Sequence, residues 1–214
     1  MVASGSEDTK VTEVIARDAF RLQARATCAV GERRRYRVAH FFAGGGNWKL
    51  TDVDKLVYLS LGSNLGDRAA NLRDAISRLA GLGEVMAVSS FYETEPVELA
   101  AQPWFLNCAV TLKTRKMPKQ LIGGILALEQ EMGRRRLQKK GPRNIDIDIL
   151  LFGSSIVETK GLTIPHPSLH ERRFVLEPLA EIAPEVRHPV FKRTMRDLRD
   201  HLPPGQAVRK VSSQ

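Results

Sequence analysis

The sequence is poor in cysteine and aromatic residues, and it contains no long hydrophobic run. Its two cysteines, Cys28 and Cys108, form no CxxC pair, which indicates reduced thiols in a cytoplasmic protein rather than a disulfide scaffold. Cys108 lies in an apolar segment and is interpreted as a small core residue. No apolar run reaches the roughly 18 residues of a transmembrane helix, and the polar residues 1–10 do not resemble a secretory signal. We therefore expect a cytoplasmic protein that does not insert into membranes.

The chain carries a formal net charge of +9, a surplus that is typical of proteins that bind polyanions. The arginines cluster in one internal loop instead of following one face, and aromatic residues amount to only 6%. A basic loop beside acidic residues suits a polyphosphate better than a nucleic acid duplex. The charge pattern therefore favours a small anionic substrate and no nucleic-acid partner.

With 214 residues, the chain is long enough for one domain of ordinary size and an appendage. Residues 1–55 lack strong periodicity, contain an arginine run and end near three consecutive glycines. We interpret them as a mostly disordered N-terminal extension with some helix around residues 14–22, or as an over-extended start of the reading frame. A folded domain is expected at 56–205, and a C-terminal tail at 206–214.

From Leu56 onward, regular hydrophobic periodicity predicts alternating strands and helices. Asp67 is expected to cap a helix with one apolar face that ends near Gly81. The predicted strands are residues 56–61, 85–94, 104–113 and 145–152, with an edge strand at 157–162; the later predicted helices are 119–132, 174–182 and 195–201. This order predicts a ferredoxin-like α+β sandwich, in which helices flank an antiparallel sheet.

Asp146 and Asp148 occur two residues apart in a strand rich in isoleucine and leucine. Residues i and i+2 of a strand point to the same face, so the two carboxylates lie side by side. In apolar surroundings they repel each other and resist desolvation unless a cation lies between them. Oxygen ligands favour Mg²⁺, which proteins usually hold together with substrate phosphates. The pair predicts a magnesium site; an exposed edge strand with its acids in water is the alternative.

A basic loop precedes this pair. It contains Arg134, Arg135, Arg136, Lys139 and Lys140, and a Gly-Pro turn then places an arginine, residue 143, three positions before the first aspartate. The planar guanidinium fork matches phosphate oxygens, and such a cluster beside a metal site is neutralised by a polyanion. The segment at 141–148 therefore predicts a site for a nucleoside triphosphate, with a solvated basic loop as the alternative.

Three further features of the sequence, a histidine, a glutamate and a glycine-rich turn, can each be interpreted in two ways. His166 lies between two prolines and could donate to phosphate or bond a backbone carbonyl. Glu129 could orient Arg134 or Arg143, or it could be a surface acid. Residues 62–67 resemble a phosphate cradle but lack its Gly-Lys-Ser/Thr ending and place an acid at the helix start, so we interpret them as a glycine turn bordering the site.

Four motifs, in this order, resemble those of the 6-hydroxymethyl-7,8-dihydropterin pyrophosphokinase family of folate biosynthesis. They are Gly-Ser-Asn-Leu-Gly at 62–66, Ser-Ser-Phe-Tyr-Glu-Thr at 89–94 followed by Phe-Leu-Asn at 105–107, Gly-Pro-Arg-x-x-Asp-x-Asp-Ile-Leu at 141–150, and Pro-His-Pro at 165–167. The resemblance runs from Val57 to Leu202. It implies transfer of diphosphate from ATP to the hydroxymethyl oxygen of the pterin, with release of AMP and with two Mg²⁺ ions.

The resemblance also implies roles for individual residues. The catalytic residues it implies are Arg134, Arg143, Asp146 and Asp148, of which the two aspartates match the magnesium ligands. The ATP contacts it implies are Glu129, Arg134, Arg136, Lys139, Ile149, His166 and Arg172. The pterin contacts it implies are Thr94, Glu95, Val97, Phe105, Asn107 and Phe174, where the two phenylalanines sandwich the ring and Asn107 hydrogen-bonds its edge.

Four positions depart from the family pattern. Leu126 stands where a nucleotide-contacting glutamine is found, Lys139 where an arginine is usual, Lys140 where an aromatic is common, and Glu95 where a proline is frequent. These departures affect the details of the loops rather than the reaction. The N-terminal extension is too short for the aldolase that is fused to this enzyme in some organisms, so we expect a monofunctional protein. We also expect it to be a monomer.

Two other functions remain as alternatives. A ferredoxin-like RNA-binding module would need aromatic residues on its central strands, where Asp146 and Asp148 stand instead. An inactive relative acting as a scaffold is opposed by the intact aspartate pair and by Arg143. The enzyme is therefore the function that the sequence favours.

Overall fold

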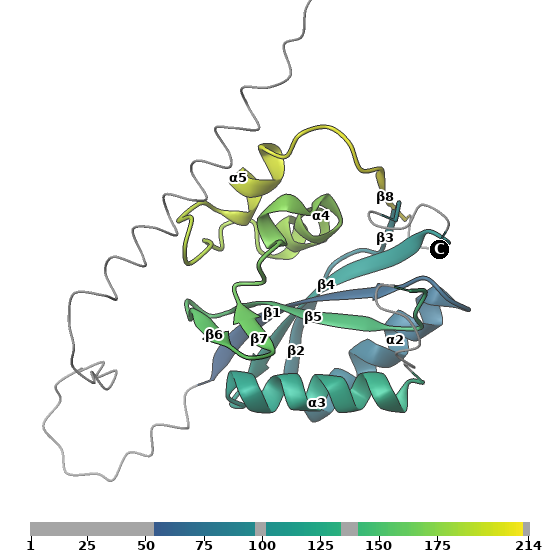
Figure 1. Cartoon of the computed structure of the whole chain (residues 1–214), viewed down its shortest axis with the longest axis horizontal. Helices are drawn as coiled ribbons and strands as arrows, with labels where there is room; N and C mark the ends of the chain where they lie inside the picture. Colours follow the sequence, from purple (N-terminus) through teal and green to yellow (C-terminus); the bar gives the residue numbers. More distant parts are fainter. Residues whose placement is uncertain (1–53, 97–101, 134–140, 212–214) are drawn as a thin grey trace, which may run out of the picture. The chain divides into compact units, whose positions relative to one another are not determined.

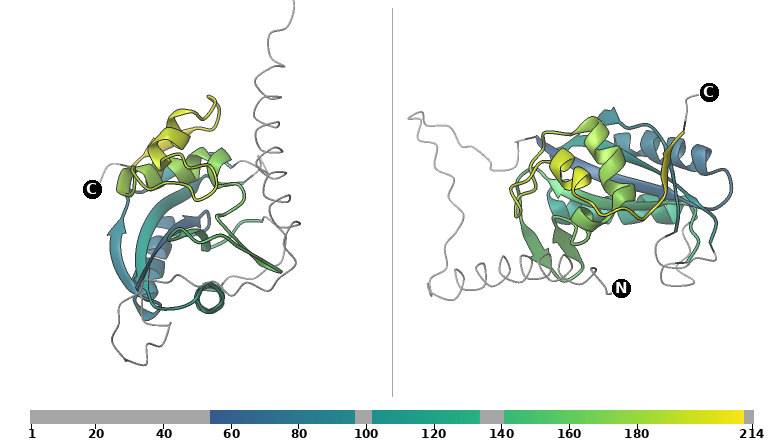
Figure 2. Two further views of the ribbon diagram at one scale, coloured as in Figure 1. Left: turned by 90° about the vertical axis from the view of Figure 1, so that its left-hand side faces the viewer. Right: turned by 90° about the horizontal axis from the view of Figure 1, so that it is seen from above.

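The computed structural model describes residues 54–96, 102–133 and 141–211. Residues 1–53 of the expected N-terminal extension, including its helix near residues 14–22, lie outside the described residues, and Lys55, the last residue of that expected extension, already belongs to the first strand. Within them, the chain forms an antiparallel sheet with helices on both of its faces (Figures 1 and 2). This is the α+β sandwich that the order of elements predicts.

The main sheet is built around strand β1, Lys55–Ser63. It pairs on one edge with β4, Phe105–Thr114, and on the other with β5, Asp146–Phe152, both antiparallel. The sheet order is β5-β1-β4-β3-β8, and a further strand, β2, also pairs with β4. The remaining strands are β2 Glu84–Val88, β3 Tyr92–Thr94 and β8 Val208–Lys210.

The single strand predicted at 85–94 is in fact two strands, because Ser89 interrupts the ladder. The Ser89 N–H donates to the Ala109 carbonyl at 2.9 Å, while the Ala109 N–H donates to the Ser89 hydroxyl oxygen at 2.9 Å. A side-chain oxygen thus replaces a backbone acceptor and competes with regular pairing. As a result, β2 and β3 pair with separate stretches of β4.

The prediction of an edge strand at 157–162 is wrong. These residues belong to a separate hairpin of β6, Val157–Thr159, and β7, Leu162–Ile164, which turns through Gly161 at a φ of +94°. That backbone conformation favours glycine. In contrast, β8 lies within residues 206–214, which the sequence placed in a tail, yet it pairs with β3 and extends the sheet to Lys210.

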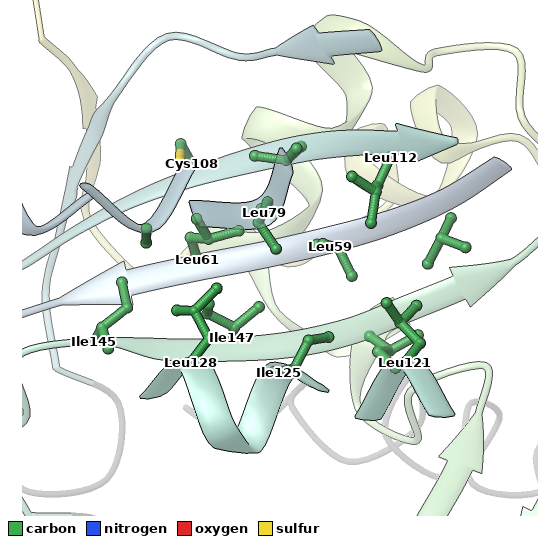
Figure 3. Close-up of a cluster of buried hydrophobic side chains, with 14 of the residues drawn as sticks. Leu59, Leu61, Leu79, Cys108, Leu112, Leu121, Ile125, Leu128, Ile145 and Ile147 are labelled. Carbon is green, nitrogen blue, oxygen red and sulfur yellow. The ribbon is translucent and has the colours of Figure 1, made fainter. Parts of the chain in front are cut away.

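Helices α2, Arg68–Arg78, and α3, Pro118–Glu131, cover one face of the sheet (Figure 1). As expected, Asp67 caps α2 by accepting from the Ala70 N–H at 2.9 Å. A short 3-10 turn, Leu79–Gly81, follows α2. Figure 3 shows the core between this face and the helices, with contributions from Leu59, Leu61, Leu79, Cys108, Leu112, Leu121, Ile125, Leu128, Ile145 and Ile147.

Helices α4, Arg173–Ile182, and α5, Met195–Asp200, cover part of the opposite face. A second core lies beneath them and includes Tyr58 of β1, Ala109 of β4 and Leu150 of β5. Along β1 this face continues from the buried tyrosine to Ser60 and Gly62, which have no large apolar side chain to extend the core. The sheet therefore leaves a polar region beside α4, where the side chains of three strands meet.

No helix in the described part of the chain is long and apolar enough to cross a membrane. Cys108 is fully buried among apolar side chains, and this burial raises the pKa of its thiol to about 12. The interpretation of Cys108 as a core residue is thus confirmed. Cys28 lies outside the described residues.

Candidate active site

A cavity that is open to solvent lies over the polar region of the sheet. Residues from β1, β3, β4 and β5, from the start of α4 and from the segment before β8 surround it. They are Ser60, Gly62, Thr94, Glu95, Pro96, Gln102, Phe105, Asn107, Arg143, Asp146, Asp148, Arg172, Phe174 and Gln206. The cavity thus unites most of the described residues that the resemblance implied, whether for the pterin or for the metal.

The register of the sheet explains why these side chains meet. Gly62 of β1 lies opposite Asn107 on β4 and opposite Asp146 on β5, and Ser60 lies opposite Asp148. Directly opposed residues of antiparallel strands share a face. Gly62 has to be small because a Cβ there would lie 2.5 Å from Asn107 Oδ1.

One end of the cavity is suited to a flat heterocycle. Asn107 is 3% exposed, and its Nδ2 donates to Thr94 Oγ1 at 2.6 Å, which fixes the direction of the carboxamide. Phe105 and Phe174, from β4 and α4, line the same cavity. A carboxamide with one oriented edge beside two aromatic rings can bind the edge and the faces of a heterocycle.

The other end carries charged groups. Arg143 Nη1 lies 3.2 Å from Asp146 Oδ2, and the Arg143 guanidinium lies 5.6 Å from the centre of the Phe105 ring. Burial and the neighbouring Asp146 charge raise the pKa of Asp148 to about 6, although Arg172 and Arg143 oppose the shift. Two crowded carboxylates of this kind form a site that favours a cation.

The described residues hold no group of three or more His, Cys, Asp or Glu side chains that could bind a metal ion by themselves. A cation between Asp146 and Asp148 would therefore draw further ligands from a phosphate or from water. Mg²⁺ is bound in this way in many phosphate-transferring enzymes. The donor set thus fits magnesium bound together with a nucleotide.

Glu129 lies behind the pair of aspartates rather than on the surface. It is 2% exposed, and its Oε1 accepts from the Ile147 N–H, between the two aspartates, at 2.8 Å. The surface-acid alternative for Glu129 is therefore wrong. A buried carboxylate that accepts from β5 fixes the strand segment on which both aspartates stand.

The glycine-rich turn at 62–66 borders the site through Asn64, which is 1% exposed. Asn64 Oδ1 accepts from the Arg143 N–H at 2.8 Å, and the Asn64 N–H donates to the Arg143 carbonyl at 3.2 Å. Its Nδ2 donates to Gln102 Oε1 at 3.1 Å. The turn thus positions the backbone of Arg143 instead of cradling phosphate.

His166 sits near the charged end without lining the cavity. Its Nδ1 accepts from the Ser168 N–H at 3.2 Å, so the neutral ring carries its proton on Nε2. Burial and, next, the Arg172 charge lower the pKa of His166 to about 4. Within the described part of the chain no hydrogen bond to Nε2 is found, and a neutral imidazole of this kind is suited to donate from Nε2 to an anion.

The structure does not bring every implied residue into the cavity. Arg134, Arg136, Lys139 and Val97 lie outside the described residues. Ile149 is 4% exposed and packs in the core beneath α2 and α3, on the face opposite to Asp148. Its side chain does not line the cavity, because it follows Asp148 by one residue on the strand and therefore points to the other face.

Four lining residues were not identified from the sequence: Ser60, Pro96, Gln102 and Gln206. Ser60 could have been found, since it precedes Gly62 by two positions on the same strand face. Gln102 and Gln206 come from segments without periodicity. No local pattern marks them.

Residues 58–184 match the family model of 7,8-dihydro-6-hydroxymethylpterin-pyrophosphokinase. The chain is 46% identical over 136 residues to the 2-amino-4-hydroxy-6-hydroxymethyldihydropteridine pyrophosphokinase of Bacillus subtilis. This match covers 63% of this chain and 81% of that protein. It is 41% identical over 143 residues to the protein of the same name from Aquifex aeolicus, covering 67% and 89%.

A longer relative is the folic acid synthesis protein fol1 of Schizosaccharomyces pombe, 42% identical over 162 residues. The match covers 75% of this chain but only 22% of that protein, so the chain spans about a fifth of its length. Among solved structures, the HPPK-DHPS protein of Plasmodium falciparum with pterin and p-hydroxybenzoate superposes with a TM-score of 0.56 at 19% identity, covering 70% of this chain and 42% of that one. At this identity the likeness shows the fold alone. The family match and the bacterial relatives establish that the chain belongs to the 7,8-dihydro-6-hydroxymethylpterin-pyrophosphokinase family.

Proposed function

We propose that this protein transfers the diphosphoryl group of ATP to 6-hydroxymethyl-7,8-dihydropterin, which yields the pterin diphosphate and AMP in the biosynthesis of tetrahydrofolate. The observation that carries the proposal is the division of one cavity into two ends. Phe105, Asn107 and Phe174 form an aromatic end with an oriented carboxamide, and Asp146 and Asp148 form a carboxylate end. The acceptor and the phosphate donor would meet between them.

At the aromatic end, the pterin ring lies between Phe105 and Phe174. The Thr94 hydroxyl takes one N–H of the Asn107 carboxamide, which leaves its oxygen and its second N–H for the polar edge of the ring. Holding the ring at its faces and its edge fixes the direction of the hydroxymethyl group. Backbone groups of Glu95 and, outside the described residues, Val97 complete the proposed pterin contacts.

At the charged end, Asp146 and Asp148 would hold magnesium, and we propose two ions. Bound magnesium neutralises phosphate oxygens and lowers the pKa of the attacking hydroxyl. The raised pKa of Asp148 supports this assignment, because a nearby cation relieves the repulsion that raises it.

Arginines and a histidine complete the triphosphate contacts. Arg143 Nε is buried and has no hydrogen-bond partner within the described residues, so it is available to a phosphate oxygen. Arg172 adds a second positive charge, and neutral His166 donates from Nε2. We assign Glu129 a supporting role behind the metal ligands. Arg134, Arg136, Lys139 and the backbone of Ile149 remain predicted ATP contacts.

The chemistry needs orientation and charge neutralisation more than a protein nucleophile. The hydroxymethyl oxygen attacks the β-phosphorus, and the bond from that phosphorus to the oxygen bridging to the α-phosphorus breaks. AMP leaves with the bridging oxygen, and the hydroxyl proton is released. Arg143 and Arg134 are the proposed clamps on the charge that develops during transfer.

The test is chromatography of nucleotides after incubation of the purified protein with ATP, Mg²⁺ and 6-hydroxymethyl-7,8-dihydropterin. We expect AMP in equal amount to the pterin diphosphate. Asp148→Asn keeps the size of the side chain and should lower turnover by at least about a thousandfold, since the metal site supplies much of the charge neutralisation. Formation of ADP, or nucleotide turnover that does not depend on the pterin, would refute the proposal.

We also propose that the protein acts as a cytoplasmic monomer. Its buried, unpaired Cys108 suits a reducing compartment. Light scattering of the full chain tests the oligomeric state: the mass should be close to 23.9 kDa.

A further inference from the structure

The segment between α5 and β8 runs along α4 and ends beside β3; it is drawn in yellow in Figure 1. At its beginning, Arg173 Nη2 donates to the Leu202 carbonyl at 3.1 Å and to the Pro203 carbonyl at 3.3 Å. At its end, β8 pairs antiparallel with β3, and this pairing begins with Val208 opposite Thr94. The segment is thus anchored at both ends to elements that border the cavity. We call residues 202–210 the C-terminal strap.

Gln206 is the residue of the strap that lines the cavity. Its Nε2 donates to the Glu95 carbonyl at 2.9 Å, and its Oε1 accepts from the Phe174 N–H at 3.3 Å. The next residue continues the connection, because the Glu95 N–H donates to the Ala207 carbonyl at 3.1 Å. One side chain therefore joins the segment after β3 to the first turn of α4.

The chemistry of the carboxamide explains why a glutamine suits this place. A carboxamide offers both an acceptor and donors, so it can bridge an N–H and a carbonyl, which a carboxylate or an ammonium cannot do. The Phe174 N–H lies in the first turn of α4, where backbone donors have no partner within the helix. Gln206 satisfies that donor and fixes the start of the helix relative to Glu95.

The two joined segments adjoin the two rings of the aromatic end. Phe174 contributes its ring from α4, while Glu95 directly follows Thr94, which pairs with Phe105 of β4. The separation between these two rings decides whether a flat heterocycle makes contact on both faces. A small change in that separation weakens dispersion contacts across the whole ring.

We propose that Gln206 is a positioning residue that sets the width of the heterocycle slot through the C-terminal strap. It acts on the affinity for the flat acceptor, because both of its hydrogen bonds go to backbone groups of residues at the aromatic end, Glu95 and Phe174. This inference rests on the proposed function. It adds a determinant of acceptor affinity from the segment before β8, which the sequence placed at the start of a tail.

The test compares Gln206→Met with Lys210→Met. Methionine keeps the length of glutamine and removes both hydrogen bonds, whereas Lys210→Met removes a 3.1 Å bond to Glu181 from the same strap, outside the cavity. For Gln206→Met we expect the KM for the pterin and the Kd for fluorescent 6-hydroxymethylpterin to rise about tenfold. The kcat and the KM for ATP should stay within about twofold of wild type, and Lys210→Met should leave all four values within about twofold.

Gln206→Glu provides a second variant in case the methionine disturbs folding, which thermal unfolding of both proteins monitors. The carboxylate can still accept from Phe174 but meets the Glu95 carbonyl with an oxygen, so pterin affinity should fall at least as far. Equal losses for the pterin and ATP, or a fall in kcat at unchanged pterin KM, would overturn the inference. The inference would also fail if the wild type turns over the pterin but Gln206→Met has the same pterin KM and Kd as Lys210→Met. A wild type that neither binds nor turns over the pterin would instead refute the proposed function.

Discussion

At the scale of single residues, Gly62 shows how a missing side chain can shape a binding site. A methyl group at this position would lie 2.5 Å from Asn107 Oδ1 and 3.8 Å from the Phe105 ring. The end of a flexible side chain can move, so we expect Gly62→Ala to fold but to displace the Asn107 carboxamide. The Kd for 6-hydroxymethylpterin, measured by fluorescence titration, should rise about tenfold or more, equivalent to about 1.4 kcal/mol.

Gly123→Ala is the matched control for this prediction. Gly123 lies on α3, and a Cβ there meets nothing within 4 Å. Alanine is the better helix former, so this variant should be slightly stabilised and should bind the pterin as wild type does. If Gly62→Ala bound the pterin normally, Asn107 would not be the residue that recognises its edge.

The same scale shows what a sequence reveals about a site and what it hides. The aspartate pair is visible because two positions on a strand share a face whatever the rest of the fold does. Glu129 could have been placed in the core, since it follows Leu121, Ile125 and Leu128 on the buried side of α3. The bond of Asn64 to Arg143 joins residues 79 positions apart. No local pattern contains such a contact, because the fold creates it.

At the scale of elements, the alternation of strands and helices was predictable, and the errors lie where side chains compete with backbone pairing. Ser89 breaks one expected strand through its own hydroxyl, which hydrophobicity does not register. Strand β8 was missed because a three-residue edge strand with two exposed basic residues carries no apolar pattern. Short edge strands depend on the neighbour that they pair with.

The attachment of α4 to the sheet gives a prediction at this scale. Glu181 of α4 accepts hydrogen bonds from Ser90, from the Tyr92 hydroxyl and from Lys210. Burial alone would raise the pKa of Glu181, but these bonds lower it. Glu181→Gln leaves an amide facing donors, so we expect a loss of about 2 kcal/mol in the free energy of unfolding in urea, the size of a hydrogen bond to a charged group.

Glu185→Gln is the control for the anchoring role. Glu185 forms one exposed ion pair with Arg196 at 2.8 Å, and exposed pairs contribute less than about 1 kcal/mol. Equal stability of the two variants would mean that the contacts of Glu181 do not fasten α4 to β3 and β8.

At the scale of the whole molecule, three buried groups among the described residues make stability depend on pH between about 6.5 and 5: two histidines and Asp148. His188 is 3% exposed and accepts from the Val190 and Phe191 N–H groups through Nδ1. Burial and then the His170 charge lower its pKa to about 4, as burial and Arg172 do for His166. Both histidines bind fewer protons in the folded state than in the unfolded state, where their pKa is about 6.5. Their stabilisation is therefore complete above pH 6.5 and is lost as the pH falls toward 4.

Asp148 acts in the opposite direction. Its pKa is raised to about 6 in the folded protein from 3.8, so without metal its ionisation destabilises the fold, and acidification relieves this. When the pH falls from 6.5 to 5, the two histidines together lower the free energy of unfolding by about 3 kcal/mol, and Asp148 raises it by about 1 kcal/mol. We therefore expect the free energy of unfolding in urea, measured without Mg²⁺, to fall by about 2 kcal/mol across this interval.

Two variants separate these contributions. His188→Asn keeps an acceptor near the position of Nδ1 but cannot titrate, so it should remove roughly half of the histidine effect. Asp148→Asn should steepen the loss of stability with falling pH and should raise stability at pH 7, while abolishing any stabilisation by added Mg²⁺. The prediction would be contradicted if Asp148→Asn had the same dependence of unfolding free energy on pH as wild type and were still stabilised by Mg²⁺. That result would show that the two aspartates do not repel each other and do not bind the metal. The same substitution thus links the acid response of the whole fold to the carboxylates that we assign to the active site.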